Sequence, residues 1–108
     1  MATFFKGDEI KFAITLEATG FSMDTDDFDI EVKSGNTSIK GYQGVQKEES
    51  SGIVIFKEGD AWYAIADTAG LATGTMRVIA TAHIPDANAN DGIRKNIAVQ
   101  PLGQLKDA

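Results

Sequence analysis

The sequence predicts an all-β protein, an immunoglobulin-like antiparallel β-sandwich of about seven to eight strands. Apolar residues recur at every second position in most segments, turn signals separate these segments at intervals of about ten residues, and no segment keeps a helical period. The 108 residues, 43% of them hydrophobic, suffice for one domain, 1–108, with a real core. An open β-barrel shows the same alternation and remains the alternative architecture.

The first half of the chain contains three segments of strand type. In residues 10–16 and 27–33 apolar side chains alternate with polar ones, which places the apolar set on one face of each strand. A Gly-Asn pair at 35–36 can adopt the positive φ of a tight turn, and it precedes a short strand at 37–40. We expect the polar residues 47–52 to form a loop.

The middle of the chain predicts a hairpin and a connection. Residues 53–56 are apolar on both faces, which favours a central strand. Residues 57–60 form a hairpin-type turn, and 61–66 return as the next strand. Residues 67–74, rich in Gly, Ala and Thr, form a connection with room for one helical turn.

The last third predicts a second pair of strands. Residues 76–84 show the longest alternation, 85–92 form a loop, and 93–99 form the last strand. We expect Pro101 to end that strand and residues from about 101 to 108 to be a frayed tail.

The charge balance excludes several classes of partner. Ten Lys and Arg against sixteen Asp and Glu give a net charge of −6, and no basic cluster stands out, so neither nucleic acid nor an anionic membrane surface is an expected partner. The longest apolar run is far shorter than the roughly 20 residues of a membrane span. The N-terminal residues lack the pattern of a signal peptide, so we expect synthesis without one. The absence of cysteine excludes disulfides and thiolate sites.

No residue pattern predicts catalysis or a cofactor. His83 is the one histidine, but no serine lies in a nucleophile motif, and its strand face carries Arg77 and Thr81. The glycines are scattered, so no phosphate-binding loop is indicated. We therefore expect a protein that is not an enzyme, with no catalytic and no cofactor-binding residue.

Two acidic segments raise the question of calcium. Of the carboxylates in 24–31, those from Asp27 onward alternate with apolar residues, which is typical of a solvated strand face preceded by a polar turn. Asp86, Asn88, Asn90 and Asp91 have the oxygen spacing at which an EF-hand loop begins, but the glycine falls one place late and Ile97 stands where the bidentate Glu should be. A hairpin loop is the preferred interpretation, so no metal site is assigned, and calcium at these four residues remains an alternative.

Trp62 and Tyr63 raise the question of sugar binding. Adjacent residues of a strand face opposite sides, so the two rings cannot form one flat platform. We expect one ring in the core and the other exposed. A binding module for a glycan or a peptide is the alternative function.

Short motifs follow one another along most of the chain in a recognisable order. They are Phe5-Lys6-Gly7-Asp8, Trp62-Tyr63-Ala64-Ile65-Ala66-Asp67, Leu71-Ala72-Thr73-Gly74-Thr75-Met76, Ile84-Pro85-Asp86 and Asp91-Gly92-Ile93-Arg94. In this order they resemble the N-terminal β-sandwich domain of phage baseplate upper proteins and related immunoglobulin-like phage or prophage tail proteins.

The resemblance implies a non-catalytic structural and assembly module of a virion, in the tail or the baseplate. It implies protein partners, either further copies of the chain in a homo-oligomer or other virion proteins. It also implies synthesis in a bacterial cytoplasm and a final location in the virion. The residues that we expect at such an interface are Phe4 and Phe5 in the N-terminal segment, and Asp86 and Arg94 in the last two motifs.

Overall fold

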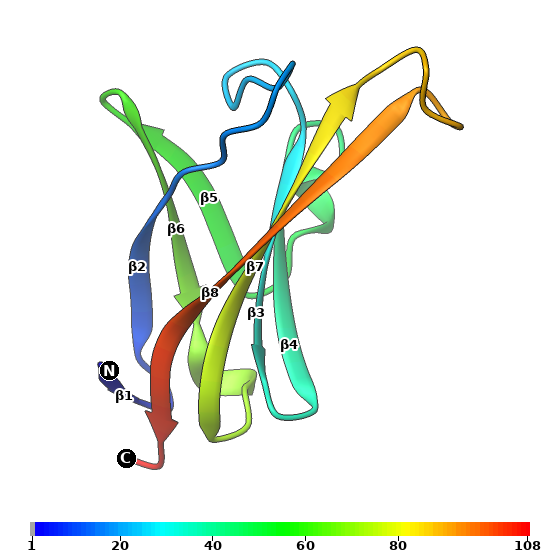
Figure 1. Ribbon diagram of the computed structural model, residues 1–108. Coiled ribbons are helices and arrows are strands. Elements are labelled where there is room, and N and C mark those ends of the chain that lie inside the picture. The colour runs from blue at the N-terminus through cyan, green and yellow to red at the C-terminus, as the bar shows by residue number, and fades with distance from the viewer. Residues whose placement is uncertain (1) are drawn as a thin grey trace.

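The protein is a two-sheet β-sandwich. The computed structural model describes residues 2–108, which form eight strands in two facing sheets (Figure 1). The larger sheet has the order β1-β8-β7-β3-β4 and the smaller sheet the order β2-β6-β5. The bounds are β1 Thr3–Phe5, β2 Glu9–Ile14, β3 Phe28–Ser34, β4 Thr37–Gln43, β5 Ile53–Glu58, β6 Ala61–Asp67, β7 Gly74–Pro85 and β8 Ile93–Lys106. The predicted all-β sandwich is confirmed.

The core lies between the sheets and follows the alternation of the sequence. In β3 the side chains of Phe28, Ile30 and Val32 are at most 1% exposed, while the polar residues between them face away from the smaller sheet. The smaller sheet covers this face with the apolar side chains of its own inner face, among them Ile10 and Ile55. Burial of these two apolar faces against each other is the main force that holds the sheets together.

One side of the sandwich is closed by backbone contacts between the sheets, where β4 approaches β5. Lys40 and Ser51 exchange backbone hydrogen bonds of 3.1 and 2.8 Å. Next to them, Gly41 lies so near Ile53 that a Cβ at Gly41 would come within 2.9 Å of the Ile53 carbonyl oxygen. The sheets can therefore approach this closely only with glycine at position 41.

The strand β5 corrects one expectation. It lies at the edge of the smaller sheet, although its apolar sequence favoured a central strand. Its inner residues Ile53 and Ile55 are buried, whereas Val54 on the other face is 62% exposed. The two short connections contain 3₁₀ turns: one lies at Lys47–Glu49 inside the expected loop, and the other, Thr68–Gly70, confirms the expected helical turn.

The strand β8 corrects a second expectation. It is the longest strand, with 14 residues, and it passes through Pro101, so residues 101–106 are not a frayed tail. Proline is tolerated there because the ladder with β7 shifts register beside it, and because no described strand pairs with β8 at Pro101 on the side away from β7. Leu105 is 1% exposed, and β1 pairs in parallel with residues 104–106.

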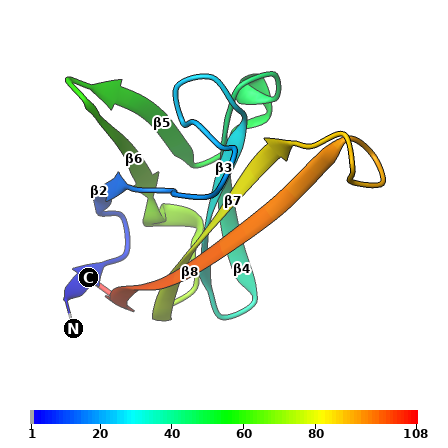
Figure 2. The ribbon, with the colours of Figure 1, turned by 45° about the horizontal axis from the view of Figure 1, so that its top comes forward.

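The far end of the β7–β8 hairpin diverges from the smaller sheet, as two views of the molecule show (Figures 1 and 2). The molecule is elongated, measuring 48 × 31 × 26 Å, and its radius of gyration of 14.3 Å exceeds the roughly 13 Å typical of a domain of this length. The hairpin thus exposes more strand surface than a closed sandwich would.

Candidate functional site

The largest unpaired sheet edge among the described residues belongs to β8. On one side β8 pairs with β7 from Ile93 to Leu105, with a register shift beside Pro101. On the other side β1 pairs only with residues 104–106, so residues 93–102 have no strand partner there. An edge of this kind presents a row of N–H and C=O groups that can bind another strand.

The same part of β8 exposes large apolar side chains. Ile97 is 63% exposed and Val99 is 57% exposed, and Ile93 at the hairpin end is 37% exposed. The ladder places Ile97 beside Thr81 and Val99 beside Ile79, on the face that points away from the smaller sheet. An apolar cluster next to an unpaired edge is typical of a protein–protein contact surface.

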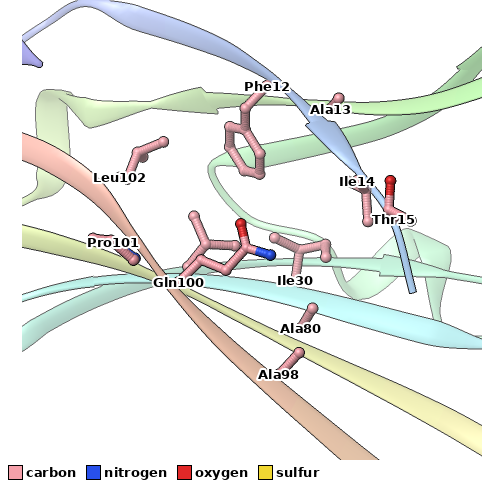
Figure 3. Close-up of a pocket in the computed structure, with 11 residues that line it drawn as sticks. Phe12, Ala13, Ile14, Thr15, Ile30, Ala80, Ala98, Gln100, Pro101 and Leu102 are labelled. Atoms are coloured by element: carbon pink, nitrogen blue, oxygen red, sulfur yellow. The ribbon is translucent and has the colours of Figure 1, made fainter. Parts of the chain in front are cut away.

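A shallow groove runs along the inner side of this edge. It lies between β2, an edge strand of the smaller sheet, and β8, and its volume is about 90 Å³ (Figure 3). Its lining includes Phe12 and Ile14 from β2, Ala98, Gln100 and Leu102 from β8, and Ile30 and Ala80 from β3 and β7 of the larger sheet. Small-molecule sites usually have about 300–1,000 Å³. This groove is therefore much smaller than a typical small-molecule site.

Charge in β8 is confined to the two ends of the strand. Arg94 and Lys95 lie at the hairpin end, the next charged residue of the strand is Lys106, and Pro101 lies between. Lysine and proline are residues with which natural proteins guard sheet edges against unwanted pairing. The central residues Ile97, Ala98 and Val99 have no such guard.

The hairpin loop uses its polar side chains within the protein. The Asp86 carboxylate accepts hydrogen bonds from the backbone N–H of Asn88 at 3.0 Å and from the Arg94 guanidinium at 3.2 Å. These two donors, the backbone N–H first, hold the pKa of Asp86 below its usual range. Arg94 also donates to the Thr19 carbonyl at 2.7 Å. Asp86 and Arg94, two of the four expected interface residues, therefore both anchor the hairpin loop.

The two carboxylates among the four candidate calcium ligands, Asp86 and Asp91, both accept hydrogen bonds from the chain itself. Asp91 accepts a hydrogen bond from the Ile93 backbone N–H at 3.2 Å, separately from the Asp86 contacts. Among the described residues, no group of three or more His, Cys, Asp or Glu side chains is placed to hold a metal ion.

His83 forms a pair with Asp29. The His83 Nε2 atom lies 2.9 Å from the Asp29 Oδ2 atom, and both side chains are half-buried. Asp29 comes from the acidic segment 24–31, whose four aspartates each have a different partner. No serine or threonine hydroxyl in the described chain is hydrogen-bonded to His83, so the pair is not completed to a nucleophilic triad.

Trp62 and Tyr63 lie on opposite faces of β6. The Trp62 ring packs edge-to-face on the core residue Phe28, with 5.5 Å between ring centroids. Tyr63 stacks on Phe56 at 6.0 Å, a pairing that only the β5–β6 register reveals, and the Lys11 ammonium lies 4.7 Å from the Tyr63 ring centroid. As their adjacent positions on one strand predicted, the two rings do not share a surface.

The N-terminal segment is attached to its own chain. Phe4 packs against the core, whereas Phe5 is 48% exposed. β1 carries both residues and is already paired with the end of β8. The sequence did not single out Ile97 and Val99 as interface residues, because alternation shows that they share a face but not whether that face is covered.

No helix in the described part of the chain is long and apolar enough to cross a membrane. No protein-family model matches this chain, and neither a curated protein nor a solved structure matches it.

Proposed function

We propose that this chain is a non-catalytic structural module that works by protein–protein contact, and that the unpaired edge of β8 is its contact surface. The observation that carries the proposal is the run of residues 93–102, which has free backbone groups on one side and exposes Ile97 and Val99. An added strand gains backbone hydrogen bonds and covers apolar side chains at the same time.

The polar groups elsewhere support a structural role. His83 and Asp29 contact each other. The Asp24 carboxylate accepts hydrogen bonds from the Lys57 ammonium and the Trp62 indole N–H. The Asp86 carboxylate accepts them from the Asn88 backbone N–H and the Arg94 guanidinium. Groups used in this way hold segments together, whereas a catalytic group must be aimed at a substrate.

We further propose that the module belongs to a phage or prophage virion, in the tail or baseplate. This part of the proposal rests on the resemblance of the motifs between Phe5 and Arg94. Virion proteins assemble through repeated contacts, and a free sheet edge suits that purpose.

The virion assignment is tested on particles from the source strain. We expect the chain to sediment with purified tail or phage particles at a fixed stoichiometry, measured by quantitative mass spectrometry. The variant Ile97→Lys should be incorporated at least tenfold less, since a charge then stands on the proposed contact surface. Val54→Lys is the matched control, because Val54 is 62% exposed and lies on the other sheet. Absence of the chain from the particles, or equal incorporation of the two variants, would contradict the proposal.

A peptide-binding module remains the second candidate, because an extended peptide can add to the same edge. The glycan form of this alternative has less support, since Trp62 packs on the core and donates its indole N–H to Asp24 at 3.1 Å. Titration with peptides of alternating apolar sequence would distinguish a peptide-binding module: saturable binding that Ile97→Lys removes supports it, and no binding contradicts it.

A further inference from the structure

We infer that the strand that occupies the β8 edge is β8 of a second copy of this chain, in antiparallel orientation about a twofold axis at Ala98. The inference rests on the proposed function of this edge as a contact surface. It specifies the partner, the orientation and the register.

The length of the free edge defines the centre of the pairing. β1 occupies the edge from Gln104 onward, where the Gln104 N–H donates to the Ala2 carbonyl at 2.8 Å. The hairpin loop ends just before Ile93. Within the free residues 93–102, the nine residues 94–102 are centred on Ala98, so an antiparallel copy can pair with this stretch and avoid β1, and the hydrogen bond lost at each Pro101, which has no N–H, falls near the end of the seam.

The side chains of this stretch are complementary to themselves in that register. Ile97 lies opposite Val99 of the second copy, and these two pairs join the exposed apolar residues on one face. On the other face Asn96 lies opposite Gln100 of the second copy, and two amide side chains can exchange hydrogen bonds. Apolar residues thus meet apolar residues, and amides meet amides.

The charges select the antiparallel orientation. Arg94 lies opposite Leu102 of the second copy and Lys95 lies opposite Pro101, so no charged pair meets across the seam. Parallel pairing in register would bring two arginines and two lysines together, and like charges directly opposite one another destabilise a sheet. Each chain carries a net charge of −6, but β8 contains no acidic residue. The contact strand therefore adds no negative charge at the seam between the two copies.

The twofold pairing would join two five-stranded sheets into one continuous sheet. It would also bring Asn96 of the second copy to the mouth of the groove beside Gln100. The unpaired backbone, the exposed apolar pair and the open groove would then be covered by one contact.

The first test is an engineered crosslink, made simple by the absence of cysteine from the chain. In the inferred dimer Ala98 faces Ala98 of the second copy, with Cβ atoms about 4.5–5.5 Å apart, which is close to disulfide geometry. We expect Ala98→Cys to form a disulfide-linked dimer on mild oxidation. Ser38→Cys, on the opposite edge strand β4, is the control and should stay largely monomeric. Equal crosslinking of the two variants would overturn the inference.

The second test is the mass in solution, measured by light scattering behind size exclusion over a range of concentrations. The 11.5 kDa chain should approach twice that mass as the concentration rises. Ile97→Lys should raise the dimer dissociation constant at least tenfold, while Val54→Lys leaves it unchanged, and circular dichroism should show both variants folded. A wild-type monomer at every concentration up to about 1 mM would overturn the inference.

The two proposals fail in different ways. A monomeric chain that still enters particles and depends on Ile97 to do so would overturn the second copy as partner and keep the β8 edge as the contact surface. If the Ile97→Lys variant enters the particles as well as the wild-type chain does, the proposed function itself is overturned.

Discussion

At the scale of single residues, Asp24 shows how one side chain fastens a loop to the sandwich. Its Oδ1 atom accepts hydrogen bonds from the Lys57 ammonium at 2.9 Å and from the Trp62 indole at 3.1 Å. Lys57 and Trp62 lie opposite each other on β5 and β6. The carboxylate therefore joins the segment before β3 to the smaller sheet, a role that its place in an acidic run did not reveal.

These contacts predict a pH dependence of stability. The Lys57 hydrogen bond, and after it the Trp62 hydrogen bond, lower the pKa of Asp24 in the folded chain. The stabilisation is therefore present at neutral pH and is lost as the pH falls below about 4. We expect Asp24→Asn to lower the melting temperature at pH 7 and to lose less stability than the wild type between pH 5 and 2.5. Asp60→Asn, in an exposed turn, is the control, and identical pH profiles for the wild type and Asp24→Asn would refute the role.

At the scale of elements, β8 combines two functions in one strand. Its last residues, with the buried Leu105, belong to the core and hold β1, while its first ten residues form the free edge. The register shift beside Pro101 separates the two parts. Local sequence could not reveal this division, because proline ends a strand only where its missing N–H was needed.

The buried end of β8 predicts a large loss of stability on truncation of one side chain. Leu105→Ala should lower the free energy of unfolding by about 2–5 kcal/mol, since it removes a fully buried side chain and leaves a cavity. Urea denaturation followed by Trp62 fluorescence would measure the change. The exposed neighbour Lys106→Ala should change it by less than about 0.5 kcal/mol. An equally small effect of both substitutions would mean that this segment is frayed after all.

At the scale of the whole molecule, the two sides of the sandwich differ. On the β4–β5 side the sheets are joined by the backbone pair of Lys40 and Ser51, while on the β2–β8 side a groove separates them. The closed side fixes the distance between the sheets, and the open side leaves an edge available for a neighbouring strand.

The closed side can be tested at Gly41. A methyl group there would lie within 2.9 Å of Ile53, so Gly41→Ala should lower the free energy of unfolding by about 1–3 kcal/mol. Gly70→Ala is the matched control, because a Cβ at Gly70 meets no atom within 4 Å. Chemical denaturation of both variants gives the comparison, and a neutral Gly41→Ala would contradict the tight contact.

The sequence alone predicted the all-β sandwich, most of its strands and the separation of Trp62 from Tyr63 onto opposite faces. These follow from local rules: period-two alternation, turn residues and the geometry of a single strand. Three features were decided only by the tertiary structure: the edge position of β5, the passage of β8 through Pro101, and the exposure of Ile97 and Val99. The physical reason is the same for all three. Alternation shows which side chains share a face, but which strand lies beside another, and which face is then covered, depends on contacts between residues far apart in the chain.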